Sequence, residues 1–402
     1  MRRVVADDAV ALARSWFPEP DDLSWLLAVL RQRARGFTAT FLSAYGVGAP
    51  LPADLAAEVA VATARTALLR KVQQTLQAAV PDVVAVKGLA VADAYPEGVA
   101  RRLGDLDLVT GDEAALWQVV EVGAREFGLT VRAVLTFPVP STSMATRGLM
   151  VTLKAVPRTP FEEPVALDVS THALVGDGTG VPAWPGPRGR RPGPADHLVM
   201  IAAERLEQPF TPKDVFDAAV LAGEVADGGG AALAAARALA REIRLEPEFA
   251  ELLELAAFHE LPVPDQLRFT RSEVRAARAR RGRELAAVLV RHPLEASLHA
   301  VQRAEVLPSR GAGPRRQLWR AADRWLSPQA PVRRALFGFG LPVVVDGHSD
   351  RPLLRSPAGD YLLVNGREVT DAWLDAALAP APDPEMDLFG PDGRPPATSE
   401  RG

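Results

Sequence analysis

The spacing of hydrophobic residues divides the chain into helical and strand-rich stretches. Within residues 23–42 and 55–80, apolar side chains recur every three or four positions, which is the period of an amphipathic helix. Asp54 is the predicted N-cap of the second helix. We therefore expect residues 1–80 to form an N-terminal helical segment that ends at Pro81, because proline stops a helix.

Beyond this segment, short apolar runs alternate with helical stretches. The pattern predicts strands at residues 83–86, 105–109, 130–137, 149–156 and 165–171, with helices at 89–95 and 112–127. Such a mixture predicts a compact α/β core domain over residues 81–175. The expected fold class is therefore α+β.

The rest of the chain returns to a helical pattern. A Gly- and Pro-rich stretch at residues 176–194 marks the predicted domain boundary, and a helical domain is expected over residues 194–305. Asp-Gly and Asn-Gly turn signals punctuate short β-like runs in a small segment at residues 330–378. The tail at residues 380–402 is rich in Pro, Asp and Gly, so we expect it to be disordered.

Composition narrows the classes of function. The 402 residues include no cysteine, which excludes disulfides, a disulfide-linked partner and Cys-ligated zinc. The absence of a signal peptide and of a long apolar run predicts a cytoplasmic protein with no membrane partner. A net charge of −4 gives no general nucleic-acid footprint, and the arginines between Arg271 and Arg283 are interpreted as a solvated helix face. Five histidines have no metal-ligand spacing and are interpreted as structural or surface residues: His197, His259, His292, His299 and His348.

Two carboxylates stand two positions apart in the second predicted strand. On a strand, Asp105 and Asp107 project to one face, while Leu106 and Leu108 lie on the opposite, buried face. Two adjacent acids repel each other unless a cation lies between them. The pair therefore predicts a Mg²⁺ site that also accepts phosphate oxygens, with Mn²⁺ as a substitute.

Lys87 and Gly88 end the first predicted strand. A glycine at a strand-to-helix turn lets backbone N–H groups approach a phosphate. The chain has only four lysines, at positions 71, 87, 154 and 213, so a lysine marks a place that favours a compact ammonium over a guanidinium.

A third carboxylate, Asp168, interrupts the last apolar run of the core. A carboxylate on a central strand is costly unless it is paired or bound to metal. We therefore predict that Asp168 completes the metal site and orients or deprotonates a hydroxyl group that attacks the bound phosphate. An edge strand with one polar face is the alternative.

The sequence of residues 83–109 resembles the core signature of the uncharacterised nucleotidyltransferase family, which belongs to the polymerase-β-like superfamily. The matching residues are Lys87-Gly88, Tyr95-Pro96, Arg101 and Gly104-Asp105-Leu106-Asp107-Leu108-Val109. The resemblance extends to about residue 220. It implies a polymerase-β-like core sheet, and a Mg²⁺-dependent transfer of NMP from an NTP to a hydroxyl group with release of pyrophosphate.

The resemblance also implies roles for individual residues. Asp105, Asp107 and Asp168 would be the catalytic and metal-binding residues, and nucleotide binding would involve Lys87, Gly88, Arg101, Lys154, Lys213 and Asp217. Lys213 and Asp217 resemble the Arg/Lys-Asp-x-x-Asp helix of the superfamily and are adjacent at i and i+4. The family implies that this helix lies over the nucleotide.

Two other functions stay open from the sequence. Relatives often have acid-x-His on the third-acid strand, whereas here His172 lies four residues after Asp168. That difference favours a catalytically weak nucleotide-binding or regulatory protein. The helix containing Lys213 also resembles one in tRNA-modifying nucleotidyltransferase toxins, although the acidic pI disfavours a tRNA partner. The acceptor is left open among a small molecule, a peptide, a protein and RNA.

Overall fold

The computed structural model describes residues 2–18, 22–138, 147–155, 164–174, 181–187, 190–206 and 208–291, together with five short strands between Arg333 and Leu362. The chain divides into two compact units. The first comprises Met1–Val109 and Pro185–Glu284, and the second comprises Thr110–Trp184 and Leu285–Gly402. The tail at 380–402, predicted to be disordered, lies outside the described residues. In the described part of the chain, none of the helices is long and apolar enough to cross a membrane.

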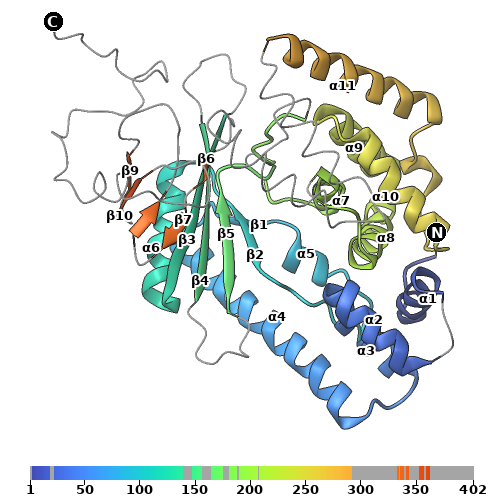
Figure 1. Cartoon of the computed structure of the whole chain (residues 1–402). Helices are drawn as coiled ribbons and strands as arrows, with labels where there is room; N and C mark the ends of the chain where they lie inside the picture. The colour runs from blue at the N-terminus through green and yellow to red at the C-terminus, as the bar shows by residue number, and fades with distance from the viewer. Residues whose placement is uncertain are drawn as a thin grey trace, which may run out of the picture. The chain divides into compact units, whose positions relative to one another are not determined.

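The first unit begins with four helices, α1 (Ala6–Trp16), α2 (Leu23–Arg33), α3 (Arg35–Gly48) and α4 (Ala53–Ala79) (Figure 1). Helix α3 packs against the other three, and its Phe37 and Phe41 are fully buried. The single helix expected over residues 23–42 is interrupted at Ala34, where φ is −141° and ψ is 44°.

The predicted cap of α4 is wrong. Pro52 is the N-cap, and Asp54 lies inside the first turn. Proline fixes its own φ, so it ends the preceding loop without a capping side chain. A carboxylate in the first turn still interacts favourably with the helix dipole.

A strand pair follows the helices. Strands β1 (Val84–Ala85) and β2 (Leu106–Val109) are antiparallel, with Val84 opposite Val109 and Ala85 opposite Leu108. Between them lies the short helix α5 (Gly88–Ala92).

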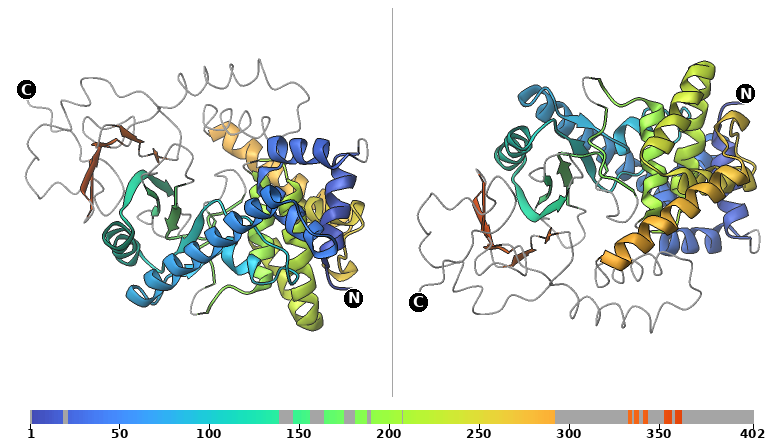
Figure 2. Two further views of the ribbon diagram at one scale, coloured as in Figure 1. Left: turned by 90° about the horizontal axis from the view of Figure 1, so that it is seen from below. Right: turned by 90° about the horizontal axis from the view of Figure 1, so that it is seen from above.

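The remainder of the first unit is helical. Its elements are α7 (Pro194–Ala203), η1 (Glu204–Leu206), α8 (Pro212–Asp227), α9 (Gly229–Glu242), α10 (Glu246–Phe258), η2 (Asp265–Leu267) and α11 (Arg271–Arg291), whose last residues pass into the second unit. Helices α7 to α10 pack against one another, as both views in Figure 2 show. Helices α7 and α8 each begin with a proline at N1, and in each the aspartate at N3 accepts a hydrogen bond from the backbone N–H of the N-cap residue. Both also contact α5, which lies in the connection between β1 and β2.

The second unit contains helix α6 (Glu113–Phe127) and the antiparallel strands β3 (Leu129–Pro138), β4 (Arg147–Ala155) and β5 (Ala166–Ser170). Asp112 is the N-cap of α6 and accepts a hydrogen bond from the Ala115 N–H, so the helix expected over residues 112–127 begins one residue later, at Glu113. A Cβ at Gly123 of α6 would lie 3.8 Å from Leu153 and 3.9 Å from Leu167. Helix α6 therefore covers the leucine face of β4 and β5.

Five short strands from the C-terminal part of the chain are also described. These are β6 (Arg333–Arg334), β7 (Leu336–Gly338), β8 (Leu341–Val343), β9 (Leu353–Ser356) and β10 (Gly359–Leu362). Strand β6 pairs with β3, and β7 to β10 form a separate sheet in the order β7-β8-β10-β9. The mixed α+β class expected from the sequence is confirmed.

Candidate functional site

The acid pair lies where β2 begins. Asp105 is exposed and directly precedes the strand, and Asp107 is half-buried within it. Leu106 and Leu108 are each 1% exposed, so the alternation predicted from the sequence is confirmed. Two carboxylates therefore project away from the core at neighbouring same-face positions.

The structure brings the Lys87-Gly88 turn next to this pair. The Val86 N–H donates a hydrogen bond of 3.0 Å to the Asp107 carbonyl, which extends the β1–β2 pairing up to the turn. A Cβ at Gly88 would lie 3.9 Å from the Asp105 backbone oxygen. Residues 17 positions apart in the sequence therefore form one polar corner of the first unit.

Lys87 has a backbone conformation that L-residues rarely adopt. Its φ is 54° and its ψ is −133°, and the following Gly88 also has a positive φ, 25°. A non-glycine residue in such a region costs on the order of 1–3 kcal/mol, and such residues cluster at functional sites. The surrounding structure must therefore hold Lys87 in place.

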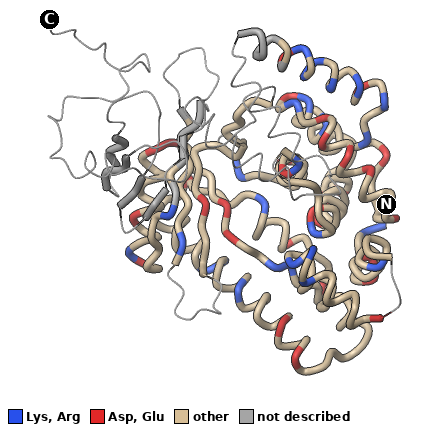
Figure 3. The backbone as a smooth tube through the Cα atoms, viewed as in Figure 1, with Lys and Arg blue, Asp and Glu red and all other residues tan. Residues whose placement is uncertain are grey.

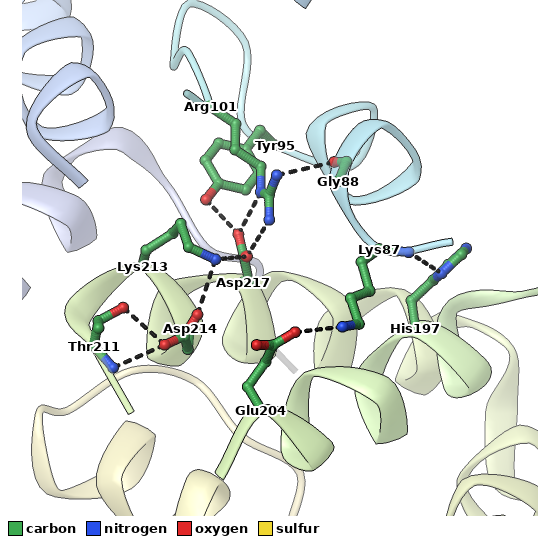
Figure 4. A network of polar contacts seen from close by, with 10 residues as sticks. All are labelled: Lys87, Gly88, Tyr95, Arg101, His197, Glu204, Thr211, Lys213, Asp214 and Asp217. Carbon is green, nitrogen blue, oxygen red and sulfur yellow. Dashed lines mark hydrogen bonds and ion pairs between the residues drawn. The ribbon is translucent and has the colours of Figure 1, made fainter. Parts of the chain in front are cut away.

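Two residues from the α7–η1 segment hold it. The Lys87 N–H donates to His197 Nδ1 at 3.1 Å, and the Lys87 ammonium forms an ion pair with Glu204 (Figure 4). Burial lowers the pKa of His197 to about 4, so its ring is neutral at pH 7 and Nδ1 can accept. Burial alone would raise the pKa of Glu204, but the charges of Lys87 and Lys213 outweigh burial and lower it, so the carboxylate stays ionised.

A buried ion pair supports the turn from the other side. Arg101 donates to both oxygens of Asp217, with Nε–Oδ1 at 2.9 Å and Nη2–Oδ2 at 2.6 Å, and Tyr95 donates to Oδ1 at 2.5 Å. The third Arg101 contact, from Nη1 to the Gly88 carbonyl at 3.1 Å, links this pair to the turn (Figure 4). The Arg101 side chain is 5% exposed and that of Asp217 is fully buried. Both stay charged: burial opposes ionisation, but their mutual attraction outweighs it, raising the pKa of Arg101 and lowering that of Asp217. Asp217 therefore fixes the Arg101 side chain, and Arg101 in turn holds the Gly88 carbonyl in position.

Lys213 lies at the edge of the same network. Its ammonium is 2.9 Å from Asp214 Oδ1 and 3.5 Å from Asp217 Oδ2, which confirms the predicted i, i+4 contact. Asp214 also accepts hydrogen bonds from the Thr211 backbone N–H and hydroxyl, both at 2.8 Å. With 29% of its side chain exposed, Lys213 is partly open to solvent, as a residue that binds a ligand must be.

The other two predicted residues belong to the second unit. Asp168 lies on β5 opposite Thr152 of β4, whose hydroxyl donates to Asp168 Oδ1 at 2.5 Å. Leu167 and Val169 are fully buried, so Asp168 lies on the face of the sheet opposite α6. Lys154 is exposed and, two residues after Thr152, shares that face.

The donor set can be compared with what Mg²⁺ requires. Within the described ranges, no group of three His, Asp or Glu side chains is close enough to hold a metal ion. Mg²⁺ usually takes one or two protein carboxylates and completes its shell with water and substrate phosphate. Asp105 and Asp107 supply two carboxylates at the start of one strand, and this donor set fits Mg²⁺.

Sequence reasoning missed three residues that shape this site. His197 and Glu204 anchor Lys87, and Arg65 of α4 donates from Nε to the Leu103 carbonyl at 2.6 Å, just ahead of Asp105. Each contacts a segment that is 38 to 117 positions away in the chain. No local pattern marks such a contact.

Comparison of the chain with protein-family models finds no matching family, and comparison with curated proteins finds no matching protein.

Proposed function

We propose that this protein is a Mg²⁺-dependent nucleotidyltransferase that transfers NMP from an NTP to a hydroxyl group and releases pyrophosphate. One observation carries the proposal: a strained Lys87-Gly88 turn, held by anchors on both sides, lies beside the backbone of the segment that bears Asp105 and Asp107. Strain that is held in place beside paired acids is characteristic of a binding site rather than of a packing core.

The residues of the first unit would bind the triphosphate. Asp105 and Asp107 would hold Mg²⁺, which when bound neutralises phosphate charge and orients the leaving group. Lys87 would supply a compact positive charge, and Gly88 would allow close approach of the backbone. Arg101 and Asp217 would keep the turn in its binding conformation, and Lys213 would face the phosphates from α8.

The chemical step needs a base for the acceptor. In our proposal the acceptor oxygen attacks the α-phosphorus, its proton passes to Asp168, and the bond to the bridging oxygen breaks to release pyrophosphate. Lys154 would add positive charge on the Asp168 face.

The same motifs support a family proposal. The order and spacing of Lys87-Gly88, Tyr95-Pro96, Arg101 and the Asp105/Asp107 pair resemble the core signature of the uncharacterised nucleotidyltransferase family, and we propose that the chain belongs to it. A polymerase-β-like core sheet is part of this proposal, as is a cytoplasmic location.

The test is transfer of a labelled nucleotide. The protein is incubated with each labelled NTP, Mg²⁺ and a cell extract, and products are examined by mass spectrometry for a mass gain of one nucleotide. We expect labelling with the wild type and none with Asp105→Asn. Asp82→Asn, which removes an exposed carboxylate just before β1, is the matched control and should retain activity. Equal labelling by the wild type and Asp105→Asn would refute the proposal.

A nucleotide-binding protein without turnover is the second candidate. The observation that favours it is the setting of Asp168, which is hydrogen-bonded to Thr152. The nearby histidine, His172, lies four residues after Asp168, whereas the family that the chain resembles often has a histidine two residues after the acid. Binding of an NTP with no pyrophosphate release under any acceptor would support this alternative.

A further inference from the structure

Helix α11 concentrates positive charge in a chain that is acidic overall. Residues 271–284 contain six arginines and two glutamates, a net charge of +4, whereas the whole chain has a net charge of −4. Figure 3 shows the basic positions recurring along this helix. The arginines divide into two groups with different surroundings.

The inward group holds the helix to its neighbours. Arg280 donates to Glu246 at 2.9 Å, and Arg281 donates to Glu248 at 2.6 Å, both at the start of α10. Val274 and Ala277 are buried on the same side. These contacts account for two of the six arginines.

The outward group has no such role. Arg271, Arg275, Arg278 and Arg283 are exposed, and no ion pair to any described residue involves them. The first three lie at i, i+4 and i+7, so they form one strip on the solvent side. The two glutamates of the helix do not neutralise this strip: Glu273 pairs with Arg237 and Arg241, and Glu284 pairs with Arg244.

An uncompensated strip of this kind works against helix stability. Like charges three or four residues apart repel and destabilise a helix. Nothing in the described fold offsets that repulsion on the outward face. A polyanionic partner would offset it.

The residues between the arginines indicate which polyanion fits. The outward positions are Ser272, Ala276, Ala279 and Gly282, all small and exposed. Large apolar side chains that would insert into a membrane are missing from these positions, as are aromatic rings that would stack on single-stranded bases and amides that would read base edges. What is left is phosphate contact by guanidinium groups, which bind phosphate through paired hydrogen bonds.

We propose that the outward face of α11 binds the sugar–phosphate backbone of duplex nucleic acid without reading its sequence. The stretch from Arg271 to Arg283 spans about 18 Å at 1.5 Å per residue. One strand of a duplex presents a phosphate about every 3.4 Å along its axis, so each of the four arginines has a phosphate within the span.

Fluorescence anisotropy with labelled duplexes of about 24 base pairs, DNA and RNA, over a series of salt concentrations tests the proposal. The strip variant is Arg271→Gln/Arg275→Gln/Arg278→Gln. The matched control is Arg14→Gln/Arg33→Gln/Arg191→Gln, three exposed arginines from other elements. Both variants lose three charges, which takes the net charge from −4 to −7. Circular dichroism checks that each variant is folded.

We expect the wild type to bind duplex with a steep salt dependence. The strip variant should lose at least tenfold in affinity at low salt, and its slope of log K against log salt should be about 2.7 shallower, or 0.9 for each lost phosphate contact. The control variant should bind like the wild type.

Three results would overturn the proposal: no salt-dependent binding of either duplex, equal losses in both variants, or tighter binding to anionic vesicles or to the single strand than to the duplex. The assay contains no NTP and measures no transfer. The outcome is therefore independent of the proposed nucleotidyltransferase activity.

Discussion

Replacing Lys87 by glycine and by alanine measures the strain at the candidate site. Both substitutions remove the ammonium group and leave Glu204 without its ion pair, so that loss is common to the two variants. They differ in the Cβ atom. Alanine keeps it and must adopt φ 54° and ψ −133°, whereas glycine adopts this conformation without a steric penalty.

The expected difference follows from two opposing effects. The unfavourable backbone region costs alanine about 1–3 kcal/mol. Glycine loses about 0.4–1 kcal/mol more conformational entropy on folding. We therefore expect Lys87→Gly to be more stable than Lys87→Ala by about 1 kcal/mol, although both should be less stable than the wild type.

Urea denaturation followed by circular dichroism gives the comparison. Lys71 offers the matched control because it is exposed in the interior of α4, where the backbone is helical. There the order should reverse, with Lys71→Gly less stable than Lys71→Ala by about 1 kcal/mol. If Lys87→Ala is as stable as Lys87→Gly, the backbone at Lys87 is not strained and the reasoning from strain to function is wrong.

Two further predictions concern the residues around the turn, and a third concerns Asp168. Because burial lowers the pKa of His197 from 6.5 to about 4, its contribution to stability is complete above pH 6.5 and falls by about 1.4 kcal/mol per pH unit down to about pH 4. His197→Asn, whose amide oxygen accepts from the Lys87 N–H but does not titrate, should remove that pH dependence in urea titrations. Asp217→Asn should lower the free energy of unfolding by about 3–5 kcal/mol because it leaves Arg101 buried without its partner. Asp227→Asn, at the exposed end of the same helix, should cost under about 1 kcal/mol. Thr152→Val removes the hydrogen bond to Asp168, so it should slow nucleotide transfer without unfolding the protein. An unchanged rate of pyrophosphate release would show that this hydrogen bond does not contribute to catalysis by Asp168.

The features that the sequence predicted well depend on local physics. The buried leucines on either side of Asp107 follow from the two-residue period of a strand, and the helix expected over residues 112–127 follows from its apolar period. The contact of Lys213 with Asp217 follows from helix geometry. Each of these needs only residues within a few positions of one another.

The features that the sequence did not predict depend on distant residues or on competing local preferences. The anchors of Lys87 come from His197 and Glu204, which are brought to it by the packing of α5 against α7. Arg101, predicted to bind nucleotide, donates hydrogen bonds to Asp217 and to the Gly88 carbonyl. Asp217 lies 116 positions away in the chain, so the contact is not visible in the local sequence. At α4, the N-cap is Pro52 and not Asp54, because the proline ring fixes the backbone φ angle at the residue before the helix.

The measurement that tests the central claim most directly is isothermal titration calorimetry with ATP, CTP, GTP and UTP, with and without Mg²⁺. We expect at least one NTP to bind to the wild type when Mg²⁺ is present. Asp105→Asn and Asp107→Asn should each weaken this binding at least tenfold, whereas Asp82→Asn should not. Absence of binding by all four nucleotides, or equal binding by the wild type and both acid variants, would contradict the existence of a Mg²⁺–nucleotide site at this turn.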